Sequence, residues 1–212
     1  RYPRTLDADL DALGAHGVEV AFVPGVDEVY PPGVQLETIP AGPVGELFEG
    51  AARPGHFDGV LGVCHRLFSL TSCDIAVFGE KDAQQLFLVQ DMVEKRQLPL
   101  RIVSVPIVRD ADGLALSSRN AYLTPEQREV ALALPEALTM AQQAIDTAGI
   151  EPAVARAREY LAKTSGLDLD YVDVIAADTF QPLQPDQKGE AIILGAVRVG
   201  KTRLIDNVRV PR

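Results

Sequence analysis

The chain has 212 residues, of which 47% are hydrophobic and 24% are charged, and its formal net charge is -10 at pH 7. A chain of this length and composition can bury one large core or two modest ones, which excludes the disordered and fibrous classes. A groove that neutralises nucleic-acid phosphates needs a basic excess, so the acidic balance argues against nucleic acid as a partner. We expect a soluble globular protein.

No stretch of the sequence approaches the roughly 20 apolar residues that a membrane span needs, and no secretory signal is recognisable. The sequence therefore predicts no membrane partner and a cytoplasmic location. Its two cysteines are Cys64 and Cys73. One disulfide would not be a framework in a chain of this size, so we expect both to be reduced residues that serve packing.

The N-terminal half has the pattern of a parallel α/β fold. Apolar spacing and the intervening Gly and Pro residues predict a helix over 6–16, strands over 18–23 and 34–39, a helical turn over 44–48, a helix over 57–70, a strand over 74–78, a helix over 82–96 and a strand over 100–108. Strand, helix and strand at this spacing form the parallel α/β unit.

The pattern changes after Val108, where α+β elements with an antiparallel sheet are expected. The sequence predicts a short strand over 113–117, a helix that begins at the capping residue Thr124 and is kinked or broken at Pro135, a helix over 152–164, and strands over 169–176, 191–199 and 202–210. The last two strands are predicted to form a hairpin at Gly200-Lys201.

The segment 78–82, Phe-Gly-Glu-Lys-Asp, lies where a predicted parallel strand meets a helix. Open parallel sheets bind ligands at this position. Gly79 allows a ligand to approach the backbone, Lys81 supplies a charge suited to phosphate, and Asp82 can accept hydrogen bonds from sugar hydroxyls. Gln85 adds an amide about one helical turn further on. The alternative is a solvated helix start in which the carboxylates favour the helix dipole and Lys81 points to water.

A second polar segment, Leu-Ser-Ser-Arg-Asn over 116–120, combines two hydroxyls with a guanidinium. These side chains can donate hydrogen bonds to the non-bridging oxygens of a triphosphate or of departing pyrophosphate. Its place near the predicted start of the second domain suggests a hinged clamp. The alternative is a Ser/Thr turn that caps the following segment, with Arg119 in a surface ion pair.

Both segments resemble those of one enzyme family, the pantothenate synthetases or pantoate–beta-alanine ligases. The run 78–86, with Phe-Gly-Glu-Lys-Asp, one variable residue and Gln-Gln-Leu, closely matches the family's hallmark segment. The runs 106–123 and 53–60 resemble the same family, and 2–5 resembles a loop that follows its pantoate-binding strand. The resemblance therefore extends over nearly the whole chain.

The resemblance implies a Rossmann-like parallel-sheet domain over 1–107, incomplete at its N-terminus, and a smaller α+β lid domain with an antiparallel sheet over 108–212. It also implies a homodimer and an ATP-dependent ligase reaction with Mg²⁺. In that reaction pantoate and ATP form pantoyl adenylate and pyrophosphate, and beta-alanine then displaces AMP to give pantothenate.

The same resemblance assigns roles to individual residues. The implied ATP contacts are Gly79, Glu80, Lys81, Asp82, Val108, Leu116, Ser117, Ser118 and Arg119. The implied catalytic groups among them, which would act electrostatically, are Lys81, Ser117, Ser118 and Arg119.

Substrate and metal roles are also implied. Gln85 would contact pantoate, and Arg53 and His56 are further substrate-binding candidates, although His56 could equally be a helix-entry residue. Asp9 resembles a carboxylate that helps to place Mg²⁺, but it could simply decorate the first helix.

Two features of the family pattern are not found in the sequence. They are a pair of His residues separated by Gly, and a Gln-bearing second strand that holds pantoate. Both are expected upstream of Arg1, so the chain as written is predicted to have little or no ligase activity. Two other functions stay open: another α/β nucleotidyltransferase, such as a cytidylyltransferase-like protein, and a non-catalytic module that binds nucleotide or dimerises. Gln85 favours the ligase, because a nucleotidyltransferase does not need an amide for pantoate.

Overall fold

The structure is a computed structural model that describes residues 5–184, 187 and 189–210. The chain divides into two compact units, residues 1–38 and 39–212, which are described separately. The predicted boundary between residues 107 and 108 lies within the second unit and stays a prediction. The run 2–4 that took part in the family resemblance lies outside the described residues.

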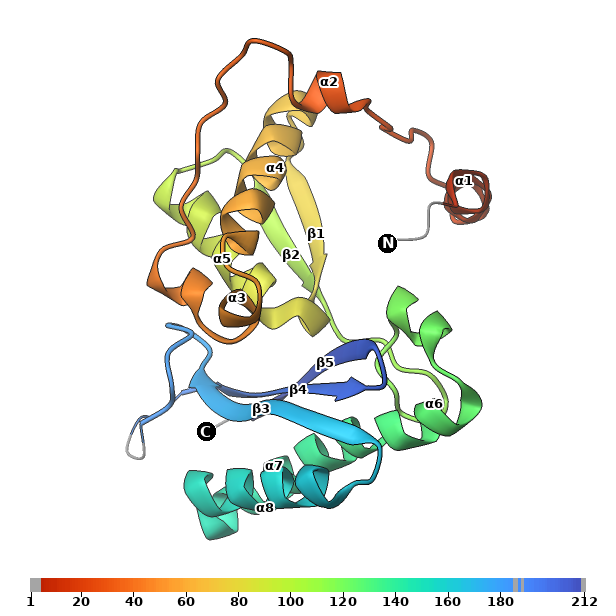
Figure 1. Cartoon of the computed structure of the whole chain (residues 1–212). Helices are drawn as coiled ribbons and strands as arrows, with labels where there is room; N and C mark the ends of the chain where they lie inside the picture. Colours follow the sequence, from red (N-terminus) through yellow and green to blue (C-terminus); the bar gives the residue numbers. More distant parts are fainter. Residues whose placement is uncertain (1–4, 185–186, 188, 211–212) are drawn as a thin grey trace. The chain divides into compact units, whose positions relative to one another are not determined.

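The described part of the first unit contains two helices, α1 (Leu6–Ala15) and α2 (Val26–Val29) (Figure 1). The first helix confirms the prediction, but the strands predicted over 18–23 and 34–39 are wrong, because both segments lack regular structure. Val20 and Phe22 are 80% and 51% exposed. A β-prone run forms a strand only when another strand pairs with its backbone, and no such partner lies in the described part of this unit.

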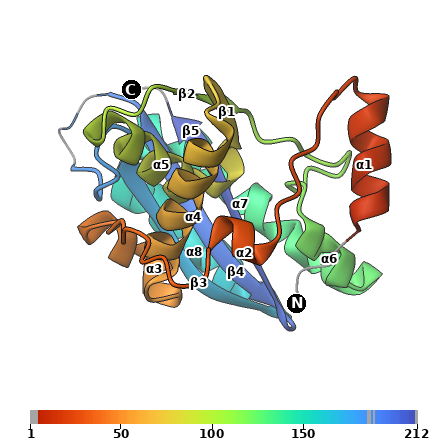
Figure 2. The same cartoon turned by 90° about the horizontal axis from the view of Figure 1, so that it is seen from above.

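The second unit begins with the predicted parallel α/β arrangement. Its elements are η1 (Pro43–Glu46), α3 (Phe48–Ala52), α4 (His56–Thr71), β1 (Ile75–Gly79), η2 (Glu80–Asp82), α5 (Ala83–Lys95) and β2 (Arg101–Val105). β1 and β2 pair in parallel, with Ile75 opposite Arg101. α4 and α5 cover one face of this sheet, where Phe57, Leu88 and Val89 form the core (Figures 1 and 2).

The second half of this unit is an antiparallel sheet with helices. Its elements are η3 (Ser118–Tyr122), α6 (Pro125–Ala131), α7 (Ala133–Ala148), α8 (Ile150–Lys163), β3 (Leu167–Ala176), β4 (Ala191–Val199) and β5 (Thr202–Val210). The strand order is β3-β4-β5, and the predicted β4–β5 hairpin at Gly200-Lys201 is confirmed.

Both faces of the antiparallel sheet are covered. Ile193 and Val197 pack with residues of α7 and α8, whereas Ile192 and Leu194, which alternate with them along β4, join a second cluster with Ala83 of α5. All residues of β4 except Arg198 are therefore buried. This double packing brings the start of α5 against the antiparallel sheet.

Two local predictions in this half need correction. The strand predicted over 113–117 is wrong, because only an isolated bridge joins Arg109 to Ala115. The predicted helix break lies at Leu132, between α6 and α7, and not at Pro135. Pro135 lies in the first turn of α7, where a missing N–H costs no intrahelical hydrogen bond.

The predicted cap of α6 is confirmed, because Thr124 Oγ1 accepts a hydrogen bond from Gln127 N at 3.2 Å.

Cys64 and Cys73 are free thiols, and burial raises the pKa of Cys64 to about 11. No helix in the described ranges is long and apolar enough to cross a membrane.

A tight backbone approach at Gly50 of α3 provides a test of the packing between η1 and α3. A Cβ atom at Gly50 would lie 1.8 Å from the carbonyl oxygen of Gly45. Because backbone must move to relieve this overlap, we expect Gly50→Ala to lower the free energy of unfolding by about 1–3 kcal/mol in urea titrations.

Gly59 of α4 is the matched control, because a Cβ there meets no atom within 4 Å. Gly59→Ala should raise the free energy of unfolding by about 0.5–1 kcal/mol through helix propensity. Equal effects of the two substitutions would contradict the described approach of the two backbones.

Candidate active site

A cavity of about 330 Å³ opens in the second unit between η2 and α5, the segment 114–120, and β5. It brings together seven of the predicted site residues: Arg53, His56, Lys81, Asp82, Gln85, Ser117 and Arg119. The other predicted residues of this unit do not line it: Gly79, Glu80, Val108, Leu116 and Ser118. The two polar segments of the sequence therefore face one space, and the ligand contacts of all these residues stay predictions.

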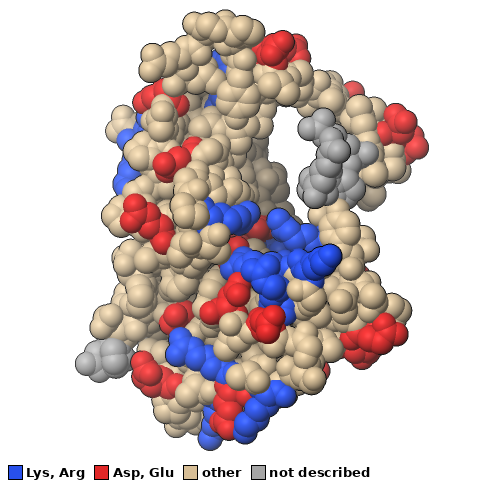
Figure 3. Space-filling model, viewed as in Figure 1, with Lys and Arg blue, Asp and Glu red and all other residues tan. Residues whose placement is uncertain are grey.

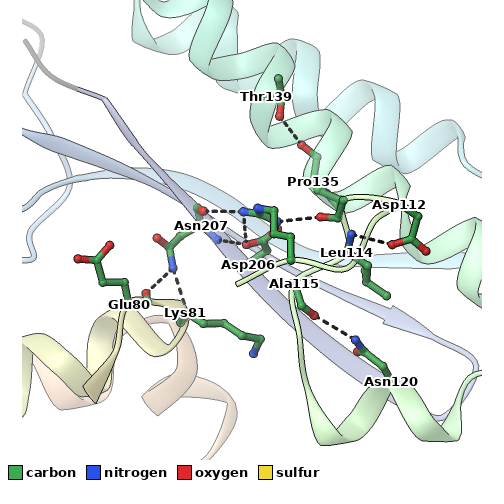
Figure 4. A network of polar contacts seen from close by, with 12 residues as sticks. Glu80, Lys81, Asp112, Leu114, Ala115, Asn120, Pro135, Thr139, Asp206 and Asn207 are labelled. Carbon is green, nitrogen blue, oxygen red and sulfur yellow. Dashed lines mark hydrogen bonds and ion pairs between the residues drawn. The ribbon is translucent and has the colours of Figure 1, made fainter. Parts of the chain in front are cut away.

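The main chain at Lys81 is held from the opposite sheet. Asn207 Nδ2 donates to the carbonyl oxygens of Glu80 and Lys81 at 2.9 and 3.0 Å (Figure 4). From this support the Lys81 side chain extends toward the segment that carries Ala115 and Asn120 (Figure 4). No described residue forms an ion pair with Lys81. Its charge is therefore available to a ligand.

The carboxylate of Glu80 is engaged within the fold. It accepts a hydrogen bond from Ser104 Oγ at 2.8 Å, and its other oxygen lies 3.4 Å from Arg209 Nε. The side chain thereby ties the end of β1 to β2 and β5. The predicted ATP contact of Glu80 stays a prediction, and its main chain is the part next to Lys81.

The segment 116–120 forms a capped turn. Ser117 Oγ accepts from Arg119 N at 3.2 Å at the start of η3, and Asn120 Nδ2 donates to Ala115 O at 3.0 Å. The alternative of a Ser turn is therefore partly correct. The surface ion pair that it assigned to Arg119 is absent among the residues described, so this guanidinium also keeps its charge available.

The loop before this turn is fixed by an ion pair that the sequence did not indicate. Arg109 binds the carboxylate of Asp206 through two hydrogen bonds of 2.6 and 3.0 Å, and it also donates to Gly113 O at 3.1 Å. Asp206 is only 3% exposed. Arg128 of α6 adds contacts of 2.6 and 2.8 Å to Asp110 and Asp112. The loop is thus attached to both β5 and α6.

A buried carboxylate, Glu49 of α3, lies on another wall of the cavity. It accepts hydrogen bonds from Tyr171 Oη at 3.0 Å and from Arg203 Nη1, and Arg53 Nη2 lies 3.4 Å away. Burial, then the charge of Glu49, raise the pKa of Tyr171, so the phenol stays a neutral donor. Gln84 Oε1 accepts from the Glu49 main-chain N–H at 3.0 Å.

Sequence reasoning missed several residues of this cavity, above all Glu49, Asp206 and Asn207, and it assigned no role to Asn120 of the second polar segment. A signal for Asp206-Asn207 existed, because two adjacent polar residues interrupt the apolar residues of a predicted strand. Adjacent strand residues point to opposite faces, so one of the two had to be directed toward the core. Glu49 carried no comparable signal.

His56 begins α4, and the preceding Gly55 has φ 74°, a left-handed conformation that suits glycine. Partial burial, and then the charge of Arg53, lower the pKa of His56, with a further lowering from Arg119. Glu49 and Asp82 act in the opposite direction. The imidazole is therefore neutral at pH 7 and can both donate and accept hydrogen bonds.

The described residues contain no group of three or more His, Cys, Asp or Glu side chains that could hold a metal ion. Asp9 lies on α1 of the first unit, where it accepts a hydrogen bond from Thr5 Oγ1 at 3.2 Å. Its predicted metal role stays a prediction.

Comparison with known proteins decides the family. The family model described as pantoate-beta-alanine ligase matches residues 1–209. The chain belongs to this family. It is 51% identical over 98% of its length to a pantothenate synthetase of Acidothermus cellulolyticus, and 50% identical over 98% to one of Nocardioides sp.. It spans 69% and 62% of the length of these two relatives.

Solved structures of pantothenate synthetases from this family share the fold. The enzyme from Thermus thermophilus matches with a TM-score of 0.93 and 42% identity, covering 100% of this chain and 77% of that one. The Francisella tularensis ligase, in a complex with beta-gamma ATP and beta-alanine, matches with a TM-score of 0.75 and 32% identity, covering 98% and 70%. The predicted family and fold class are confirmed.

The environment of His56 predicts a specific pH dependence. The pKa of His56 is lower in the folded protein than in the unfolded chain, so protonation of the imidazole favours unfolding. The free energy of unfolding should therefore be highest above pH 6.5 and should fall as the pH drops below that value. NMR titration of the imidazole should give a midpoint below 6.5. Arg119→Gln should raise this midpoint by removing a positive charge, whereas Arg156→Gln on the exposed face of α8 should not change it. A midpoint unaffected by Arg119→Gln would show that Arg119 does not face His56.

Proposed function

We propose that the cavity is the adenylate-forming site of an ATP-dependent ligase that condenses pantoate with beta-alanine. The reaction would pass through pantoyl adenylate and give pantothenate, AMP and pyrophosphate. The observation that carries the proposal is that Lys81 and Arg119 line one cavity and that no described residue neutralises either of them. Family membership and the nucleotide named for the Francisella structure support it.

In the first step a pantoate carboxylate oxygen attacks the α-phosphorus of ATP, and the bond to pyrophosphate breaks. Negative charge shifts to the phosphate oxygens and the leaving group. Lys81 and Arg119 would stabilise this charge, and the hydroxyl of Ser117 would donate a hydrogen bond. In Figure 3 Lys and Arg side chains gather near the middle of the visible face, with acidic side chains beside them.

In the second step the neutral amine of beta-alanine attacks the acyl carbon of pantoyl adenylate. The acyl carbon–oxygen bond breaks and AMP leaves, so no covalent bond to the protein forms. Catalysis then depends on holding the reactants in line and in a partly dehydrated cavity. The cavity wall includes Leu134, Leu194 and Leu204, which limit its hydration.

Subsites can be assigned by chemistry. Gln85, one turn along α5 from Asp82, offers an amide that can bond the hydroxyl and carboxylate groups of pantoate. Asp82 suits the hydroxyls of ribose. Arg53 and His56 lie on the wall that carries Glu49 and would contact a carboxylate-bearing substrate.

The proposal retains Ser118, Gly79, Glu80, Val108 and Leu116 as predicted nucleotide contacts. Glu80 would contact the nucleotide through its main chain, since its carboxylate accepts a hydrogen bond from Ser104 Oγ. Main-chain groups are also the contacts that Gly79, Val108 and Leu116 can offer, other than the Leu116 N–H and the Val108 C=O, which bond each other at 2.9 Å.

We also propose that the enzyme uses Mg²⁺, forms a homodimer and is located in the cytoplasm. Mg²⁺ is usually bound by one or two carboxylates together with substrate phosphates, and the described residues provide no cluster of three ligands. No step above is therefore assigned to the metal ion.

Two alternative functions would give different results in an assay of pyrophosphate release. A nucleotidyltransferase would release pyrophosphate with a different acceptor and would not require pantoate. A binding module would retain nucleotide without turnover. Formation of pyrophosphate that depends on pantoate separates the ligase from both.

Replacement of the free cations tests the proposal. Measured in the native enzyme, Lys81→Ala and Arg119→Ala should each lower the rate of pantoate-dependent pyrophosphate formation by about 10²–10³-fold, because each removes a charge that acts on the transition state. Both variants should keep the wild-type circular dichroism spectrum, since neither cation supports the fold through an ion pair.

Lys163→Ala is the matched control, because Lys163 pairs with Glu159 on the exposed face of α8 and does not line the cavity. It should leave the rate unchanged. Wild-type rates in Lys81→Ala would overturn the assignment of this cavity as the adenylation site.

A further inference from the structure

We propose that Asn207 is a positioning residue that sets the place of the Lys81 ammonium group in the nucleotide site. The inference rests on the proposed function, because it concerns the cation that would bind the triphosphate. Asn207 is 3% exposed and lines the cavity, yet it belongs to β5, which lies 126 residues from Lys81 along the chain.

The amide of Asn207 fits the two acceptors that it contacts. One Nδ2 atom carries two N–H groups, and it lies 2.9 Å from Glu80 O and 3.0 Å from Lys81 O. A carboxylate at this position would repel both carbonyl oxygens, and a hydroxyl could donate to only one. These two residues lie in the short η2 turn between β1 and α5, so the bonds fix the main chain from which the Lys81 side chain extends.

Asn207 is itself held rigidly. Its main-chain N–H donates to Asp206 Oδ1 at 2.8 Å, and it pairs with Leu194 of β4, the middle strand of the sheet. Asp206 in turn binds Arg109, which anchors the loop that leads to Ser117. Two adjacent residues of one strand therefore hold the two polar segments that form opposite walls of the cavity.

This arrangement distinguishes positioning from simple packing. A residue that only stabilised the fold would affect nucleotide binding independently of Lys81. A residue that acts through Lys81 should lose its effect on binding once the Lys81 charge is gone. The two roles can be separated with a double-mutant cycle.

The experiment measures the dissociation constant of ATP by calorimetry for the wild type, Asn207→Ala, Lys81→Ala and the double variant. Asn207→Ala should weaken ATP binding by about tenfold, the scale of a lost hydrogen bond near a charged group. The double variant should bind ATP as Lys81→Ala does. Additive losses, or unchanged binding in Asn207→Ala, would overturn the inference, as would a wild type that does not bind ATP.

Gln142→Ala provides the matched control. Gln142 Nε2 of α7 donates to Arg209 O at 2.8 Å, so it bonds the same strand two residues further on without lining the cavity. It should lower stability but leave ATP affinity unchanged, and a loss equal to that of Asn207→Ala would contradict the inference. If Asn207→Ala does not fold, Asn207→Ser, which keeps one donor, replaces it in the cycle.

Pantoate-dependent pyrophosphate formation is measured in the same four proteins. If the native enzyme shows none while the cycle in ATP binding is non-additive, the ligase assignment fails and the positioning role stands. If the wild type is active but the cycle is additive, the positioning role fails alone.

Discussion

The ion pair between Arg109 and Asp206 is the interaction on which the candidate site depends. Two short hydrogen bonds join the guanidinium to a carboxylate that is almost fully buried, and the same guanidinium reaches Gly113 O. Breaking a buried pair of this kind by removing one partner typically costs about 3–5 kcal/mol, because the remaining charge is left uncompensated. The pair therefore fixes the loop before Ser117 to β5 of the antiparallel sheet with little freedom.

The charges of the cavity fall into two groups with different uses. Arg203 lines the cavity and is neutralised by Glu49, and Arg109, which does not line it, is neutralised by Asp206; both hold separate segments of the chain together. Lys81 and Arg119 have no such partner among the described residues, although they lie in the same space. A site that binds a polyanion needs this division, because cations already satisfied by carboxylates have little attraction left for phosphate.

Local sequence patterns predicted much of the fold. The strands 191–199 and 202–210 were placed correctly, because apolar residues fill the covered positions and Gly200 permits the turn between them. The strands predicted over 18–23 and 34–39 failed, since a strand requires a partner that periodicity alone does not reveal. The helix break predicted at Pro135 lies at Leu132 instead, because Pro135 falls in the first turn of α7, where proline is tolerated.

The sequence predicts those residues of the candidate site that lie together in short contiguous motifs. Lys81 and Arg119 lie in such motifs, and the structure brings both to one cavity. Asn207 and Glu49 lie far from those motifs in sequence and act through tertiary contacts, which composition and spacing do not encode. The residues that arrange the site are therefore less visible in the sequence than the residues that would contact the ligand.

The central claim is that a pantoate carboxylate attacks the α-phosphorus of ATP in this cavity. Incubation with pantoate labelled with ¹⁸O in its carboxylate, together with ATP and beta-alanine, tests it most directly. We expect one ¹⁸O atom in the phosphate of the AMP released, detected by mass spectrometry, because the attacking oxygen stays with AMP when the amine displaces it. Unlabelled AMP, or label in pyrophosphate or inorganic phosphate, would exclude attack of the pantoate carboxylate on the α-phosphorus.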